Sequence, residues 1–252
     1  MIKCITFSPT GGTRKAAEAL CNGIDNQQES FELCIPASDV KTPSLSSDDI
    51  VVIAAPVYGG RIPALAAERI ASIKGNGAMC VVVAVYGNRA YDDALIELKD
   101  IASAAGFRVI AAVSAVAEHS IVREYGAARP DAADIQALGD FGKEIFQSIG
   151  EGKVAEDVKV PGNHPYKKAG AGPVPSAGKA CKECGICAKG CPVGAISVND
   201  LKHSDKSKCI SCMKCISACP TGARAISPVM QFMVKTMLKK PCRDRKEVEM
   251  FM

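Results

Sequence analysis

Eight of the 13 cysteines fall into two copies of one spacing pattern, which constrains this chain more than any other feature. The two sets, each followed by a proline, are Cys181, Cys184, Cys187 and Cys191 with Pro192, then Cys209, Cys212, Cys215 and Cys219 with Pro220. An offset of 28 residues superposes the sets, so the segment is an internal repeat. Thiolates at this spacing are typical ligands of [4Fe–4S] cubanes, three from one copy and the fourth from the other.

The repeat predicts two clusters with crossed ligation. We assign one [4Fe–4S] centre to Cys181, Cys184, Cys187 and Cys219, and the other to Cys209, Cys212, Cys215 and Cys191. Two zinc knots are the alternative, but structural zinc usually takes paired CxxC ligands or CxxC with histidines, without a third CxxC step and a following proline. The segment from Lys179 to Ile226 resembles the bacterial two-cluster ferredoxins, with every ligand position filled.

The length of 252 residues gives room for one ordinary domain and one small domain. The first part can bury a core, whereas the cysteine-rich part depends on its clusters for stability. The longest apolar runs, Ile50 to Tyr58 and Ala78 to Tyr86, are about half a membrane span, and no charged-then-apolar leader opens the chain. These features predict a soluble, cytoplasmic protein without membrane insertion.

The net charge of +4 is unevenly divided. Residues 1–150 carry 13 Lys and Arg against 18 Asp and Glu, whereas residues 151–252 carry 18 against 9. Two oxidised cubanes with thiolate ligands would add about −4 to the second part. Its basic residues are scattered among cysteines without interleaved aromatic residues, so nucleic acid is not an expected partner.

Apolar runs rich in β-branched residues alternate with helical patterns over the first 150 residues, which predicts a parallel sheet with crossover helices. The expected strands are Lys3 to Phe7, Phe31 to Ile35, Ile50 to Ala55, Ala78 to Tyr86 and Arg108 to Ala117. The expected helices are Thr13 to Gly23, Ala64 to Ile73, Tyr91 to Ala105 and Asp131 to Ile149, the last with Ile135, Leu138, Phe141, Ile145 and Ile149 on one face. This order fits a doubly wound, five-stranded α/β fold of the flavodoxin type, whose ligand binds at the carboxyl ends of the strands.

The turn after the first expected strand predicts a phosphate site. Its residues, Ser8-Pro9-Thr10-Gly11-Gly12-Thr13, supply hydroxyls and exposed backbone N–H groups ahead of a helix N-terminus, whose dipole favours an anion. It contains neither GxxxxGK nor GxGxxG, so ATP and NAD are poor fits. A capped helix start without a ligand is the alternative. The turn resembles the flavodoxin phosphate loop, written Ser/Thr-x-Thr-Gly-x-Thr.

Two further loops follow the third and fourth expected strands. The candidate cofactor-binding residues in them are Pro56, Val57, Tyr58, Gly59 and Gly60, then Tyr86, Gly87, Asn88, Arg89, Tyr91 and Asp92. Each loop joins glycines that permit close backbone approach to a tyrosine that can stack on a flat ring. Arg61 and Arg89 are expected to face a reduced, negatively charged flavin. Each loop alone is a common strand-to-helix turn, but three such loops favour a flavin, and the phosphate loop favours FMN over FAD.

Over about residues 1–227 the chain resembles the ferredoxin-fused flavodoxins of anaerobic bacteria and archaea, and two further segments match that family. The first is Glu118-His119-Ser120, where His119 faces the expected cofactor and is the candidate catalytic proton donor. A loop histidine that fixes its own turn is the alternative. The second is Arg129-Pro130-Asp131 with Asp134, which we interpret as a helix start.

The resemblance divides the chain into a flavodoxin-like FMN domain at 1–150, a Pro/Gly-rich linker at 151–178, a small α+β two-cluster domain at 179–227 and a tail at 228–252. The tail from Val229 to Lys240 is expected to be a helix that packs in a core or between domains, with a membrane-surface helix as the alternative. Its apolar face consists of Met230, Met233, Val234, Met237 and Leu238. Cys4, Cys21, Cys34 and Cys80 are expected to be buried, and Cys242 exposed and oxidisable.

These features predict an electron-transfer protein that moves electrons between two [4Fe–4S] clusters and FMN, with other redox proteins as donor or acceptor. Clusters transfer one electron at a time, whereas a flavin accepts one or two. The alternative is an FMN-dependent oxidoreductase that reduces a small organic or quinone substrate with electrons from its clusters. Because no acid–base pair beyond His119 is evident, the sequence favours the carrier; it leaves a homodimer open.

Overall fold

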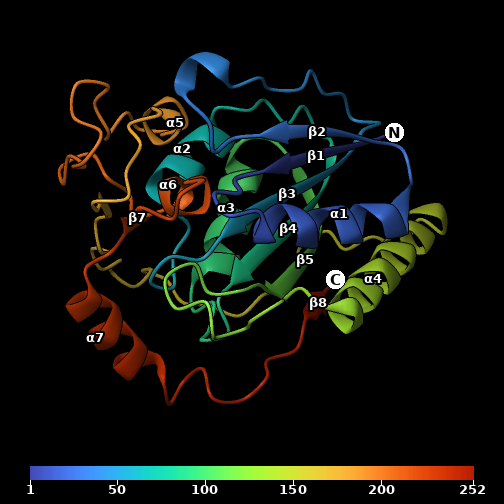
Figure 1. Ribbon diagram of the computed structural model, residues 1–252. Coiled ribbons are helices and arrows are strands. Elements are labelled where there is room, and N and C mark those ends of the chain that lie inside the picture. The colour runs from blue at the N-terminus through green and yellow to red at the C-terminus, as the bar shows by residue number, and fades with distance from the viewer.

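The computed structural model describes residues 1–252 and contains a six-stranded sheet with helices on both faces (Figure 1). Its strands are β1 (Ile2–Thr6), β2 (Gln28–Glu32), β3 (Ile50–Pro56), β4 (Met79–Tyr86), β5 (Arg108–Val116) and β8 (Glu249–Phe251). The first five are parallel and lie in the order β2-β1-β3-β4-β5. This order defines the flavodoxin-like doubly wound fold and confirms the predicted fold class.

Two helix pairs cover the sheet. Helices α1 (Gly12–Ile24) and α4 (Ala132–Gly150) contribute to the apolar core on one face, and α2 (Ala64–Ala71) and α3 (Ala94–Ala104) to the core on the other. Helices α1 and α4 approach closely because Gly23 has no side chain. A Cβ at this position would lie 2.0 Å from the carbonyl oxygen of Gly139. Both cores are built from the β-branched and alanine-rich runs that the sequence marks as buried strands.

Three predictions about this part need correction. The second strand begins at Gln28 and ends at Glu32, not at Ile35, because its backbone pairs in register from Ile2–Gln28 to Thr6–Glu32. An edge strand tolerates polar residues, since it has a neighbour on one side only. Ile135 in α4 is 38% exposed and does not belong to the buried face. The sheet has a sixth strand, β8, which pairs antiparallel with β5.

The cysteine repeat forms a small unit beside the sheet. Short helices α5 (Ile186–Lys189) and α6 (Lys214–Ser217) occupy equivalent places in the two copies. The strands β6 (Ser176–Ala177) and β7 (Arg224–Ala225) pair antiparallel and join the beginning of this unit to its end. The buried Arg224 side chain donates to the carbonyl oxygens of Leu201 (2.8 Å) and Pro175 (3.1 Å).

The tail differs from the expectation in its packing. Helix α7 (Pro228–Leu238) forms as predicted, but it projects from the body of the molecule (Figure 1) and buries only Leu238. Its exposed apolar side chains include Val229, Phe232 and Met237, so packing in a core, one of the two expected placements, is wrong. The chain then returns to the sheet, where Cys242 is 4% exposed, contrary to prediction, before it ends in β8. None of the helices combines the length and the hydrophobicity that crossing a bilayer requires.

Candidate flavin and iron–sulfur sites

A cavity of about 370 Å³, which we call the flavin cavity, lies at the carboxyl ends of β1, β3, β4 and β5. Its volume falls within the range of cofactor and ligand sites. The predicted residues that line it are Pro9, Thr10, Gly12, Thr13, Pro56, Val57, Tyr58, Gly59, Gly60, Tyr86, Gly87, Arg89 and His119. The fold therefore brings all three predicted loops together around one space.

The first loop presents backbone rather than charged side chains to this cavity. Gly11 has a φ of +93°, and a Cβ on Gly12 would lie 2.8 Å from the Ala117 Cβ, so both positions favour glycine. The Ser8 hydroxyl does not line the cavity; it accepts a hydrogen bond from the Arg14 backbone N–H (2.9 Å). Ser8 thus stabilises the start of α1, whereas Thr10 and Thr13 border the cavity.

The second loop holds Tyr58 at the cavity and turns Arg61 away from it. Arg61 donates from Nε (2.7 Å) and Nη2 (2.6 Å) to the Glu97 carboxylate, and its guanidinium lies 4.7 Å above the Tyr166 ring. Because Arg61 does not line the cavity, it cannot face a flavin there as expected. Burial raises the pKa of the Tyr58 phenol well above its usual value, so this side chain stays neutral.

The third loop divides its residues between the cavity and the structure behind it. Arg89 lines the cavity and forms an ion pair with Asp92, which also pairs with Lys167 at 2.8 Å. Asp92 and Tyr91 lie outside the lining, and the Tyr91 hydroxyl donates to Glu249 in β8 (2.9 Å). The positive charge of Arg89 is therefore partly neutralised.

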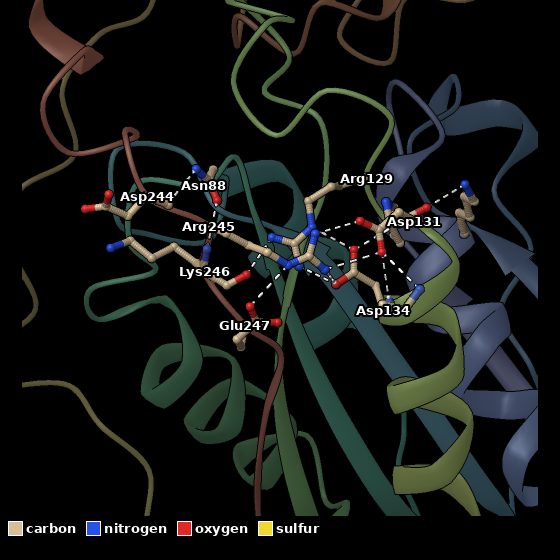
Figure 2. Close-up of polar contacts among 11 residues, drawn as sticks. Asn88, Arg129, Asp131, Asp134, Asp244, Arg245, Lys246 and Glu247 are labelled. Carbon is tan, nitrogen blue, oxygen red and sulfur yellow. Dashed lines mark hydrogen bonds and ion pairs between the residues drawn. The ribbon is translucent and has the colours of Figure 1, made fainter.

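Asn88 is buried behind the third loop and binds the last residues of the chain. Residues 242–251, which we call the C-terminal strap, run past this loop to β8 (Figure 2). The Asn88 amide donates to the carbonyl oxygens of Cys242 (3.0 Å) and Asp244 (3.1 Å), and its Oδ1 accepts from the Lys246 N–H (3.3 Å). Asn88 does not line the cavity, so its contact is with the strap rather than with a cofactor.

An ion-pair network fastens the same strap to the start of α4 (Figure 2). Arg129 and Asp134, both buried, are joined by a hydrogen bond of 2.7 Å from Nε to Oδ2. Arg245 of the strap donates to Asp131 (2.6 Å) and Asp134 (3.1 Å), and this contact holds the pKa of Asp131 below its usual value. Asp131 caps α4 by accepting from the backbone of Asp134, which confirms the predicted helix start.

His119 is held in one orientation by its own turn. Its Nδ1 accepts hydrogen bonds from the backbone N–H groups of Ile121 (3.2 Å) and Val122 (3.1 Å). Burial, followed by the nearby positive charge of Arg89, lowers the pKa of His119 to about 4. A neutral imidazole that accepts at Nδ1 carries its proton on Nε2. His119 can therefore offer an N–H donor at the cavity. Its two backbone hydrogen bonds are also those of a loop histidine that fixes its own turn, which is the alternative interpretation.

The eight repeat cysteines border two separate cavities. Cys181, Cys184, Cys187 and Cys219, which we call the outer set, border one of them. Cys191, Cys209, Cys212 and Cys215, the inner set, border the other. Each set combines three cysteines of one copy with the last cysteine of the other.

The surroundings of these thiols suit an iron–sulfur cluster. A cubane needs its four thiolates spread over separate irons, and each set places four cysteines around one cavity. The Cys191 sulfur accepts from the Ala195 N–H (3.2 Å). A hydrogen bond with Cys34 lowers the pKa of Cys212 to about 7 despite its burial. Desolvation opposes ionisation of Cys219, but backbone N–H groups lower its pKa to about 7, whereas burial raises the pKa of Cys215 to about 11.

The flavin cavity and the inner set share a wall. Ile210 borders both cavities, and its neighbour Ser211 also lines the flavin cavity. The Tyr58 hydroxyl donates to the carbonyl oxygen of Cys212 (3.4 Å). The flavin cavity is further lined by Gly170, Ala171, Gly172 and Pro173 of the predicted linker and by Val234, Met237 and Leu238 of α7. These residues carry no short-range motif, so their place at the site could not be found from the sequence.

Comparison with known proteins agrees with the two-part architecture. Residues 180–223 match the family model of the 4Fe-4S dicluster domain. The chain joins a flavodoxin-like domain to a 4Fe–4S dicluster segment. No curated protein matches the chain significantly.

Several solved flavodoxin structures align with the flavodoxin-like part. A flavodoxin from the domain Archaea is 17% identical over 60% of this chain and 99% of that chain, with a TM-score of 0.44. The two-electron reduced flavodoxin of Megasphaera elsdenii is 17% identical over 57% and 99%, with a TM-score of 0.42. The Fusobacterium nucleatum flavodoxin bound to flavin mononucleotide is 16% identical over 58% and 97%, with a TM-score of 0.41. The fold assignment rests on the strand order.

Proposed function

We propose that this protein is an electron carrier that moves electrons between two [4Fe–4S] clusters and one FMN. The observation that carries the proposal is the shared wall: Ile210 borders both the flavin cavity and the inner set, and Tyr58 contacts the Cys212 backbone. When bound, the clusters supply one-electron transfer and FMN supplies one- or two-electron chemistry. Electron exchange between a cluster and FMN requires a short distance between them through packed protein, and the shared wall provides such a contact between their two cavities.

The residues of the flavin cavity have distinct roles in this proposal. The backbone of Gly12 and the Thr10 hydroxyl bind the phosphate at the start of α1, whereas Gly11 lies outside the lining of the flavin cavity. Tyr58 would stack against the ring of a bound FMN, and the neutral His119 would donate its Nε2–H into the cavity. The α7 and linker residues over the cavity exclude water.

The inner set and the outer set are proposed as the ligands of two cubanes, with Cys191 and Cys219 crossing between the copies. The flavin domain corresponds to residues 1–150 and the cluster domain to 179–227. The linker at 151–178 is held along the flavin domain, because Asp93 in that domain accepts from the backbone of Asn163 (3.0 Å) and Lys167 (2.7 Å).

The test begins with holoprotein prepared without oxygen, for which we expect about eight irons, eight sulfides and one FMN per chain. Stopped-flow mixing with a one-electron donor should then bleach the clusters before the flavin. In Cys215→Ala, which loses an inner ligand, flavin reduction should slow at unchanged FMN content. Cys21→Ala, a buried cysteine outside both sets, is the control. Zinc in place of iron, or flavin reduction at the wild-type rate in Cys215→Ala, would contradict the proposal.

A further inference from the structure

The outer set is the more accessible of the two cysteine sets. Cys184 is exposed, whereas Cys212 of the inner set is 9% exposed and lies against the flavin domain. Ile186 borders the outer cavity and is 45% exposed, so an apolar side chain reaches solvent directly beside this set. An electron that enters from another protein therefore meets the outer set first.

The segment that carries three of the four outer cysteines is rich in lysine. Residues 179–208 contain the lysines Lys179, Lys182, Lys189, Lys202, Lys206 and Lys208, against the acidic residues Glu183, Asp200 and Asp205. Lys202 pairs with Glu183 (3.7 Å) and Lys208 with Asp205 (3.8 Å). Lys179 and Lys182 are exposed and have no carboxylate within ion-pair distance, and they flank Cys181 in the sequence. The unpaired lysines Lys179 and Lys182 beside the exposed Ile186 resemble a protein interface, which has an apolar centre and a polar rim.

We propose that Lys179, Lys182 and Ile186 form the docking surface for an acidic protein that carries a one-electron redox centre. This inference rests on the proposed function, because it assumes a cluster in the outer set. The positive charges of Lys179 and Lys182 would steer the acidic partner toward the exposed Cys184. In each encounter the partner's centre loses one electron and the outer cluster gains it. With both clusters and FMN bound, two such encounters would supply the two electrons that complete reduction of FMN requires, with protons from solvent, and Ile210 lies between the inner set and the flavin cavity.

The flavin is not the entry point in this scheme. Its cavity is covered by the linker residues 170–173, by Ile210 and Ser211, and by α7 residues, whereas no comparable cover lies over Cys184. The partner therefore reduces FMN only through the clusters. Direct docking at the flavin is the competing route, and it predicts no effect of charge at Lys179 or Lys182.

The test compares two double variants with equal changes of net charge. Lys179→Glu/Lys182→Glu reverses the docking surface, and Lys74→Glu/Arg108→Glu reverses two exposed charges at the amino ends of β4 and β5, on the opposite edge of the sheet. A reduced bacterial ferredoxin of net negative charge serves as the protein donor. A photoreduced deazaflavin serves as the small donor.

We expect the ferredoxin to reduce Lys179→Glu/Lys182→Glu about tenfold or more slowly than the wild type, with the wild-type rate falling as salt rises. The deazaflavin rates and the control variant should be unchanged. Loss of iron or FMN from the wild type would defeat the proposed function itself. Full cofactor content with equal ferredoxin rates in both double variants, or with a rate independent of salt, would overturn the docking proposal alone.

Discussion

Replacing Asn88 by glycine should release the C-terminal strap from the third loop of the flavin cavity. Asn88 has a φ of +63°, a left-handed conformation that glycine adopts without strain. The substitution therefore removes the side chain and leaves the backbone conformation accessible. What is lost is the set of three hydrogen bonds to the backbone of Cys242, Asp244 and Lys246.

The magnitude follows from these bonds. A buried hydrogen bond contributes about 0.5–1.5 kcal/mol, so three of them stabilise strap attachment by about 2–4 kcal/mol. A loss of about 2 kcal/mol increases the population of the opened strap about thirtyfold. Because the same loop supplies Gly87 and Arg89 to the cavity, FMN affinity should also fall, by about tenfold or more.

Limited proteolysis measures strap opening directly, since the strap contains the trypsin sites Arg243, Arg245 and Lys246. Cleavage there should accelerate about thirtyfold in Asn88→Gly at a trypsin concentration low enough that the strap opens and recloses many times before each cleavage. Asn76→Gly is the matched control: Asn76 has a φ of +49° and makes one side-chain bond, to the Leu45 carbonyl oxygen (3.0 Å). Equal rates of strap cleavage in the two variants, with unchanged FMN affinity, would show that the Asn88 hydrogen bonds do not hold the strap in place.

Three further predictions concern the cofactors. Cys191→Ser should remove the EPR signal of the inner cluster and leave that of the outer one; loss of the outer signal would mean that ligation is not crossed. Thr10→Ala should weaken FMN binding by about 1–3 kcal/mol but leave riboflavin affinity unchanged, and an equal loss for both would place the phosphate elsewhere. His119 has a pKa lowered from 6.5 to about 4, so its stabilising contribution is complete above about pH 6.5 and is lost as the pH falls through about 4. Deuterium exchange at the ring C2–H, followed by mass spectrometry, should give a midpoint below 5; a midpoint near 6 would show that the imidazole is not held neutral by burial.

The sequence carried enough information for the sheet and for the placing of its loops. Buried parallel strands read as continuous β-branched runs, so β3, β4 and β5 were predicted within a residue or two. The loops after these strands then had to meet at one edge, because parallel strands share their carboxyl ends. The cysteine repeat likewise specified its two sets by spacing alone, and the structure places each set around one cavity.

The particular roles of several loop residues depended on partners far away in the chain. Arg61 was expected at the flavin, but Glu97 in α3 accepts two of its hydrogen bonds. Asn88 was expected at the cofactor, but its partners lie more than 150 residues later. A local pattern gives the type of a side chain and the end of the sheet on which it lies; it does not specify which distant group will satisfy it.

The C-terminal segment shows the same division between sequence and tertiary structure. The helical period of α7 is local, and the helix was predicted, but its exposure was not, because burial depends on what packs against it. Strand β8 has three residues, too few for a periodic signal, and exists because β5 offers an unpaired edge. Local propensity and spacing therefore determined the strands, the helices and the cysteine sets. Only tertiary pairing decided that the linker and α7 line the flavin cavity and that the strap is held on Asn88 behind it, because those contacts join segments that no local pattern connects.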